Sequence, residues 1–138
     1  MTTQSTPNQA NAPVSILIAE DDTSLLEIMS MQLEKIGYEV RQSTNGKAAV
    51  KAIENNKPDI LLLDLLMPEM DGFEVLEYLK KKDIHLPIIV LTNLGQEQNS
   101  EKTLQLGATE CFVKSDTPLS VLGQKIERIV AKNRKQKE

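Results

Sequence analysis

Residues 60–72 have the sequence Ile-Leu-Leu-Leu-Asp-Leu-Leu-Met-Pro-Glu-Met-Asp-Gly. The first four residues form a continuous apolar run, which is typical of a short strand covered on both faces in a parallel sheet. The run ends at Asp64, and Pro68 lies in the segment that follows it. Further along, Asp71 can cap a helix whose third residue, Glu74, would complete a capping box. The stretch therefore predicts a buried strand, a loop and a helix, with a carboxylate at the end of the strand.

Three other apolar runs also end at polar residues. They are Ile16–Ala19 before Glu20, Asp21 and Asp22, Ile88–Leu91 before Thr92, and Cys111–Val113 before Lys114, and a weaker strand is expected around Tyr38–Gln42. Right-handed crossovers in an open parallel sheet place a ligand site beyond the carboxyl ends of the strands. We therefore expect these polar residues, which are far apart in the sequence, to meet at one edge of the sheet.

Segments with helical periodicity lie between the strands and have recognisable ends. They are Leu25–Ile36 before Gly37, Gly46–Asn56 before Pro58, a helix that begins at Asp71, Asn99–Leu106 before Gly107, and a last helix with Thr117 as its cap, Pro118 at its first position and apolar residues through Val130. Glycine after a helix can take the left-handed conformation that ends it, and proline prevents a helix from continuing. Strands that alternate with helices predict an α/β fold of five βα units around a parallel sheet.

The chain has 138 residues, a length that suits one domain with one core. Residues 1–13 are polar and lack apolar periodicity, so we expect a disordered leader, then a domain over residues 14–131 and a basic tail over residues 132–138. No stretch approaches the roughly 20 apolar residues that cross a bilayer, and the leader lacks the apolar segment of a secretory signal. The single cysteine, Cys111, cannot form an internal disulfide. These features predict a cytoplasmic protein without membrane insertion.

The formal net charge is −4, from 16 basic and 20 acidic side chains. Basic residues concentrate between Lys125 and Lys137, but this segment lacks the interleaved aromatic residues of a single-strand nucleic-acid site, and the whole chain is acidic. Cations near the end of the last helix instead suit the helix dipole. The charge pattern therefore argues against nucleic acid as a partner.

The residues expected at the sheet edge indicate a metal ion and a phosphoryl group. Carboxylates held close together repel one another unless a hard cation lies between them, and an incomplete shell of oxygen ligands favours Mg²⁺. A lysine ammonium and a hydroxyl donor beside them suit a tetrahedral oxyanion. An ionised aspartate can also act as a nucleophile and form an acyl phosphate.

Taken together, these motifs resemble the receiver domain of two-component response regulators. The resemblance rests on Ile16–Asp22, Leu62–Gly72, Leu91-Thr92 and Val113-Lys114, which occur in the family's order within about Val14 to Val130. An acidic pair after a strand is common, so the ordered set carries the weight. The resemblance implies a flavodoxin-like fold, a doubly wound five-stranded parallel sheet with strand order 2-1-3-4-5.

The resemblance also implies how the acidic residues act. Asp64 would accept a phosphoryl group from the phosphohistidine of a histidine kinase or a histidine phosphotransfer protein. Mg²⁺ would be the cofactor, held by Asp21, Asp64 and the backbone carbonyl of Leu66. Glu20 would act on the metal through a water molecule.

Two further residues would respond to the phosphoryl group. The resemblance implies that Lys114 pairs first with Asp64 and then with the phosphoryl oxygens. The Thr92 hydroxyl would move inward and hydrogen-bond the same group. A new group of about −2 charge with strong acceptor oxygens can reorganise a loop that carries a hydroxyl donor, so phosphorylation would become a change of shape.

Several positions differ from the usual pattern of the family. Asn93 follows the switch threonine where a small residue is usual. Ser115 follows the lysine where the family has a proline on a cis bond, and a cis bond before a non-proline residue costs about 2.5–4 kcal/mol. Cys111 stands where an aromatic residue often moves inward, and we expect it to be a small core residue rather than a redox sensor. Leu66 and Leu94 flank the path of hydrolytic water, which predicts a long-lived phosphoaspartate.

Two other functions compete with this one. A phosphatase that forms an aspartyl phosphate would need a second acid two residues beyond its nucleophile, where Leu66 stands. A phosphorylation-independent interaction module would keep the fold and lack the acidic pocket or the lysine, and it stays the alternative. We predict a stand-alone receiver that catalyses only its own phosphorylation and dephosphorylation. It would signal by binding an unknown protein target through its fourth helix, fifth strand and fifth helix, as a monomer or a phosphorylation-dependent dimer.

Overall fold

Strands and helices alternate along the chain, whose computed structural model describes residues 13–93 and 95–137. The strands are β1 (Ser15–Ala19), β2 (Glu39–Ser43), β3 (Ile60–Asp64), β4 (Ile88–Thr92) and β5 (Glu110–Val113). The helices are α1 (Thr23–Ile36), α2 (Gly46–Asn55), α3 (Gly72–Lys81), α4 (Ser100–Gln105) and α5 (Leu119–Lys137), with short 3-10 turns at Glu97–Asn99 and Lys114–Asp116. The predicted leader, apart from Pro13, lies outside the described residues.

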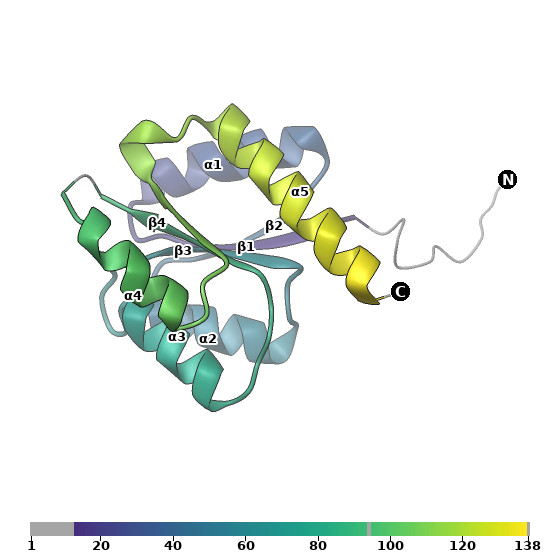
Figure 1. Cartoon of the computed structure of the whole chain (residues 1–138). Coiled ribbons are helices and arrows are strands. Elements are labelled where there is room, and N and C mark those ends of the chain that lie inside the picture. The colour runs from purple at the N-terminus through teal and green to yellow at the C-terminus, as the bar shows by residue number, and fades with distance from the viewer. Residues whose placement is uncertain (1–12, 94, 138) are drawn as a thin grey trace, which may run out of the picture.

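The strands are parallel and form one sheet in the order β2-β1-β3-β4-β5 (Figure 1). This order confirms the predicted doubly wound, flavodoxin-like arrangement. The chain begins in the middle of the sheet at β1, adds β2 on one side and then adds β3, β4 and β5 on the other. The direction of winding therefore reverses between β1 and β3, which is where open α/β sheets bind their ligands.

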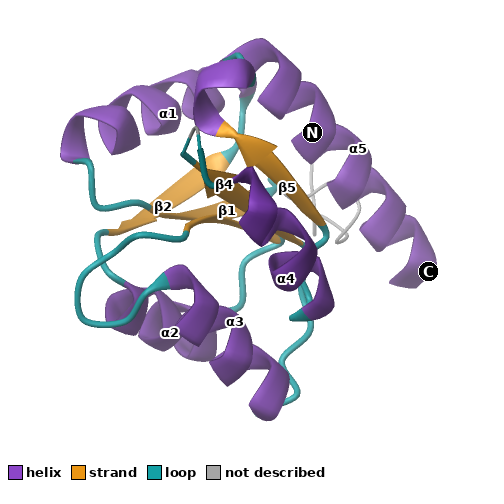
Figure 2. Ribbon diagram, turned by 60° about the vertical axis from the view of Figure 1, so that its left-hand side comes forward, coloured by secondary structure: helices purple, strands orange, loops and turns teal. Residues whose placement is uncertain are grey.

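Helices cover both faces of the sheet (Figure 2). Because successive strand residues point to opposite faces, Ile16 and Ile18 of β1 pack toward α1 and α5, while Leu17 and Ala19 pack toward α2 and α3. The central strand β3 is buried along its whole length, and even its terminal Asp64 is only 4% exposed. The two cores therefore fix the position of the strand that carries the predicted phosphoacceptor.

The predicted helix ends agree closely with the structure for α1 and α3. The Asp22 carboxylate accepts from the backbone N–H of Leu25 at 3.2 Å and starts α1. Gly37, with φ of 115°, ends that helix in the left-handed conformation. At α3 the predicted capping box is present, because the Asp71 carboxylate accepts from the Glu74 N–H at 2.9 Å and the Glu74 carboxylate accepts from the Asp71 N–H at 3.0 Å.

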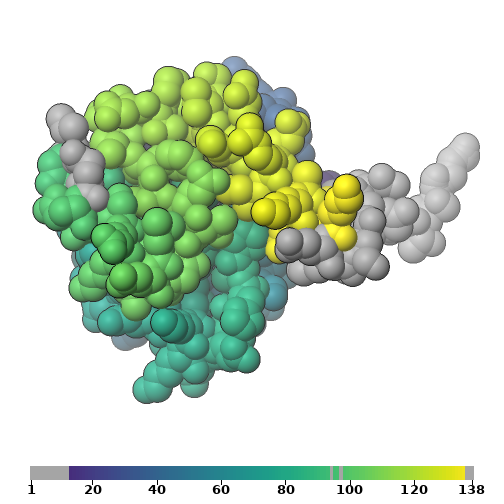
Figure 3. All heavy atoms as spheres, viewed as in Figure 1, coloured from purple at the N-terminus to yellow at the C-terminus, as the bar shows by residue number. Residues whose placement is uncertain are grey.

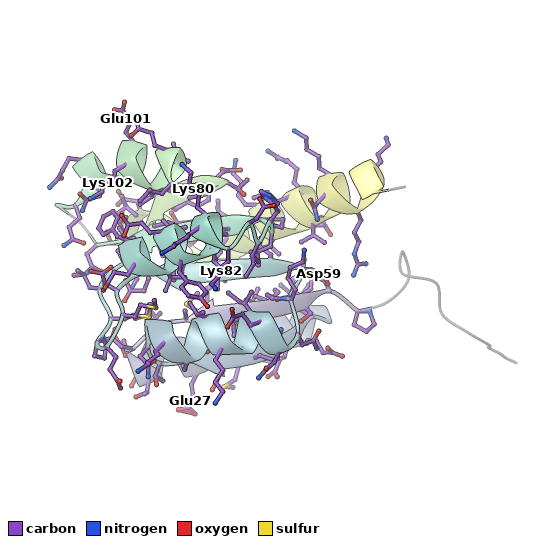
Figure 4. The ribbon with its side chains drawn as sticks, turned by 90° about the horizontal axis from the view of Figure 1, so that it is seen from below. Glu27, Asp59, Lys80, Lys82, Glu101 and Lys102 are labelled. Atoms are coloured by element: carbon purple, nitrogen blue, oxygen red, sulfur yellow. The ribbon has the colours of Figure 1, made fainter. Side chains whose placement is uncertain are left out.

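Helix α4 is shorter than predicted and is held beside α3. The expected helix spanned Asn99–Leu106, whereas α4 covers Ser100–Gln105 and Asn99 is the last residue of the preceding 3-10 turn. The Lys80 ammonium of α3 donates to the Gln105 carbonyl at 3.4 Å, and the Lys102 ammonium lies 4.6 Å from the centre of the Phe73 ring. Both lysines are labelled in Figure 4. Two surface lysine side chains thus make contacts between α4 and α3.

Helix α5 begins one residue later than predicted. Its first hydrogen bond runs from the Leu122 N–H to the Pro118 carbonyl, and the Thr117 hydroxyl donates to the Val113 carbonyl at 2.9 Å. The helix continues through residues 132–137, and Arg134 pairs with Asp59 at 3.2 Å. Figure 3 shows α5, in yellow, and α4, in green, forming much of one face of the molecule. Within the described ranges no helix is long and apolar enough to cross a membrane.

Gly72 lets the start of α3 approach the end of β3. A Cβ atom at this position would lie 2.6 Å from the Asp64 carbonyl oxygen and 2.7 Å from the Leu65 Cα, both of which are backbone atoms. At Gly123, inside α5, the nearest atom to an added Cβ would be the Ile36 Cδ1 at 3.5 Å, an ordinary contact. The two glycines therefore form a matched pair.

We predict that Gly72→Ala lowers the free energy of unfolding by about 1–3 kcal/mol, because the backbone must shift to relieve the overlap. Gly123→Ala should leave stability unchanged or raise it by up to about 1 kcal/mol, because alanine favours the helix. Urea unfolding followed by far-ultraviolet circular dichroism measures both, since the chain has no tryptophan. Equal destabilisation by the two variants would contradict the close approach at Gly72.

Candidate functional site

The polar residues that were expected to meet lie at the carboxyl edge of the sheet. Asp64 ends β3 and Thr92 ends β4, while Glu20 follows β1 and Lys114 follows β5. The strand register aligns the ends of neighbouring strands β1, β3, β4 and β5 to within one residue. Glu20 and Asp64 are buried, with exposed fractions of 2% and 4%, whereas the neighbouring Asp21 is exposed. The edge therefore combines two desolvated carboxylates with one that faces solvent.

Lys114 is the cation of this cluster. Its ammonium lies 2.6 Å from the Glu20 Oε1 and 3.3 Å from the Asp64 Oδ1. The sequence predicted the pairing with Asp64, and the structure places Lys114 close to that carboxylate but closer still to Glu20. Its half-buried position would lower the lysine pKa, but the contacts with Glu20 and Asp64 outweigh this effect and raise the pKa above its ordinary value. Lys114 is therefore a fixed positive charge at neutral pH.

Asp64 has an unusual acidity. Its burial raises its pKa to about 7, and the charge of Glu20 adds to the rise, while Lys114 and the backbone N–H of Leu66 oppose it. That N–H donates to the Asp64 Oδ1 at 3.4 Å. The cluster has one ammonium for three neighbouring carboxylates, so its negative charges outnumber its positive charge. A further cation would favour the ionised form of Asp64, which is the form that can act as a nucleophile.

The carboxylates of Glu20, Asp21 and Asp64 fit a hard divalent cation. One oxygen from each lies within 4.8 Å of the others. Such a set of oxygen ligands, which leaves room for water, suits Mg²⁺ rather than a soft metal. The chemistry of the donors therefore fits the cofactor that the sequence predicted, and the excess of negative charge supplies the driving force for binding a cation.

The Thr92 side chain faces β5 in this structure. It is 1% exposed, and its hydroxyl donates to the Phe112 carbonyl at 3.3 Å. The hydroxyl thus has a partner that it must leave in order to reach a group on Asp64. The inward movement of Thr92 remains a prediction.

The positions near the entrance to the site differ in exposure. The Leu66 side chain is 49% exposed and Asn93 is exposed. Leu94 lies outside the described residues, so the predicted shielding of a phosphoaspartate from water remains a prediction. The role of the Leu66 carbonyl as a metal ligand is likewise a prediction.

Two departures from the usual pattern, Cys111 and Ser115, lie within β5 and just after it. None of the peptide bonds in the described part of the chain is cis, and Ser115 lies in the 3-10 turn that begins at Lys114. Cys111, at the position where receivers often have an aromatic residue, is half-buried, and the Ser100 hydroxyl donates to its sulfur at 3.3 Å. The contact joins β5 to the first residue of α4.

The short contact between Lys114 and Glu20 was not predicted. The sequence offered one signal for it, namely that glutamate has one more methylene than aspartate and reaches further from the end of β1. Reach alone does not reveal direction, however. The second Glu20 oxygen, Oε2, accepts the backbone N–H of Asp22 at 3.1 Å, and this bond helps to orient the carboxylate.

Comparison with known proteins agrees with this geometry. The family model described as the response regulator receiver domain matches residues 16–126. The alkaline phosphatase synthesis transcriptional regulatory protein PhoP of Bacillus subtilis is 34% identical over 106 residues, which are 77% of this chain and 44% of PhoP. The phosphate regulon transcriptional regulatory protein PhoB of Pseudomonas aeruginosa is 33% identical over 112 residues, which are 80% of this chain and 49% of PhoB. The chain thus spans less than half the length of these curated relatives.

A solved structure of a receiver domain protein has a similar fold. The response regulator receiver domain protein (CheY-like) from Methanospirillum hungatei JF-1 superposes with a TM-score of 0.83, at 30% sequence identity, over 91% of this chain and 99% of that chain. The family match covers the segment that contains Glu20, Asp64, Thr92 and Lys114. The chain therefore belongs to the response regulator receiver domains of two-component signalling.

Proposed function

We propose that Asp64 accepts a phosphoryl group from the phosphohistidine of a histidine kinase or a histidine phosphotransfer protein. A carboxylate oxygen of Asp64 attacks the phosphorus, the bond between nitrogen and phosphorus breaks, and the imidazole nitrogen keeps the electron pair. The observation that carries the proposal is the buried Asp64 carboxylate at the carboxyl edge of the sheet, with the Lys114 ammonium 3.3 Å away. The product is an acyl phosphate on this chain.

The carboxylate cluster would bind the Mg²⁺ ion on which the proposed reaction depends. When bound, Mg²⁺ supplies positive charge that stabilises the oxygens of the transferred phosphoryl group. Asp21, Asp64 and the Leu66 carbonyl would hold it, and Glu20 would act through a water molecule. Lys114 would neutralise part of the charge that the phosphoryl group brings, from a position fixed by its carboxylate partners.

Thr92 would convert the modification into a change of shape. A phosphoryl group on Asp64 offers strong acceptor oxygens of about −2 total charge, so the Thr92 hydroxyl would exchange the neutral Phe112 carbonyl for a charged acceptor. Hydrogen bonds to charged acceptors are roughly twice as strong as neutral ones. The surface of α4, β5 and α5 adjoins Thr92 and Lys114 and would carry the signal to a protein target.

Receiver domains are phosphoacceptor signalling domains rather than enzymes that turn over a separate substrate. We propose that this chain accordingly catalyses only its own phosphorylation and dephosphorylation, and that it does so in the cytoplasm. The alternative is a phosphorylation-independent interaction module, which Asn93, Ser115 and Cys111 favour as departures from the usual pattern. The first experiment below separates the two.

Asp64→Asn should abolish phosphorylation, because an amide oxygen is too weak a nucleophile to form the acyl phosphate. Intact mass after incubation with Mg²⁺ and acetyl phosphate should show one added phosphoryl group in the wild type and none in this variant. Asp71→Asn is the matched control, because asparagine still caps α3. A wild type that stays unmodified, even with phosphorylated kinases, would favour the phosphorylation-independent module.

Asp21→Asn should weaken Mg²⁺ binding by about tenfold or more, because it removes one anionic oxygen ligand. Asp22→Asn provides the control, because Asp22 is an adjacent exposed acid whose side chain caps α1 and asparagine caps equally well. Isothermal titration calorimetry of the unphosphorylated proteins gives both affinities. Equal weakening by the two substitutions would mean that general negative charge, rather than the cluster, attracts the cation.

Thr92→Val should leave phosphorylation of Asp64 possible but uncouple it from the change of shape, because valine has no hydroxyl to donate. Thr92→Ser keeps the hydroxyl and should keep the response. The readout is the movement of backbone amide resonances of α4 and β5 when acetyl phosphate and Mg²⁺ are added. Identical movements in wild type and Thr92→Val would remove Thr92 from the proposed switch.

A further inference from the structure

Each oxygen of the Glu20 carboxylate already has a partner, an ion pair for Oε1 and a hydrogen bond for Oε2. Oε1 lies 2.6 Å from the Lys114 ammonium, and Oε2 accepts the backbone N–H of Asp22 at 3.1 Å. The Glu20 side chain is 2% exposed and that of Lys114 is 19% exposed, so bulk water screens their contact only partly. A cation that draws on Glu20 must therefore displace or share a partner that is held at short range in a desolvated site.

Lys114 has two carboxylates within reach and lies closer to one of them. Its distance to the Glu20 Oε1 is 2.6 Å, against 3.3 Å to the Asp64 Oδ1. The proposed function needs this ammonium beside Asp64, where the phosphoryl group arrives. In this structure the ammonium thus makes its shorter contact with a residue that is not the phosphoacceptor.

We propose that Glu20 is a positioning residue that tethers Lys114 in the metal-free protein, so that Lys114 and a divalent cation compete for the Glu20 carboxylate. This inference rests on the metal site of the proposed function and adds a regulatory step to it. Once Glu20 turns toward a divalent cation, directly or through water, the Lys114 ammonium keeps Asp64 as its remaining carboxylate partner. Lys114, which already lies 3.3 Å from Asp64, would then no longer be shared with Glu20 when the phosphoryl group arrives.

The tether has a direct consequence for metal affinity. Lys114 would oppose cation binding in two ways, by simple repulsion and by occupying Glu20. Repulsion persists when Glu20 is neutralised, whereas competition for its carboxylate disappears. A double-mutant cycle separates the two, because it measures whether the effect of removing Lys114 depends on Glu20.

The experiment measures Mg²⁺ dissociation constants by isothermal titration calorimetry for wild type, Lys114→Met, Glu20→Gln and the double variant. Lys114→Met should strengthen Mg²⁺ binding by about tenfold in the wild-type background and by less than about threefold in the Glu20→Gln background. Lys125→Met, which removes a lysine from α5, is the control. It should leave the Mg²⁺ affinity unchanged in both the wild-type and the Glu20→Gln backgrounds. Equal strengthening in both backgrounds would overturn the tether, because repulsion alone would then explain it.

A second measurement follows the Lys114 side chain itself and takes its decisive reading from the wild-type protein. In wild-type protein with ¹⁵N-labelled lysine, the Lys114 ammonium resonance, identified by its absence from Lys114→Met, should shift when Mg²⁺ is added. Metal-free Glu20→Gln should already show a shift in the same direction. A Lys114 resonance that saturating Mg²⁺ leaves unmoved would overturn the inference. Absence of Mg²⁺ binding in every variant would instead overturn the metal site of the proposed function, and the tether with it.

Discussion

Two carboxylates, those of Glu20 and Asp64, are buried at the edge of the sheet, and the Lys114 ammonium touches both. A buried charge is strongly disfavoured unless an opposite charge and hydrogen bonds compensate it. Lys114 supplies one positive charge, while backbone N–H groups of Asp22 and Leu66 donate to the two carboxylates. The compensation is incomplete, which is why the pKa of Asp64 is raised to about 7. The negative charges of the site are thus only partly compensated in the folded protein.

The architecture explains how such a cluster can be assembled. Residues at the ends of β1, β3, β4 and β5 are separated by whole βα units in the sequence, yet the parallel register brings them to one edge. The apolar strands themselves are fixed by helices on both faces. Gly72 permits α3 to start directly against β3, so the loop after Asp64 is anchored at both ends. A rigid scaffold therefore carries groups whose charges remain unbalanced.

Much of this arrangement could be predicted from the sequence, because its local rules are strong. Continuous apolar runs predicted the strands, and Asp71 and Gly37 marked helix ends by chemistry that depends only on nearby backbone. Three features escaped prediction, and two of them involve tertiary contacts. Helix α4 is short and lies beside α3, with contacts from Lys80 and Lys102. The direction of the Glu20 side chain depends on where Lys114 lies. The third feature is local, because the Thr117 hydroxyl donates to the Val113 carbonyl and α5 starts one residue later than predicted.

The same contacts give a physical route from the site to the surface. The Thr92 hydroxyl donates to the carbonyl of Phe112, and the neighbouring Cys111 accepts a hydrogen bond from Ser100 at the start of α4. Where a bulky aromatic side chain would respond by changing its rotamer, a small thiol instead links β5 directly to α4. If Thr92 leaves Phe112 for a phosphoryl oxygen, β5 loses a hydrogen bond one residue away from that link. The end of β5 and the start of α4 would then adjust together, and no aromatic switch is needed to connect them.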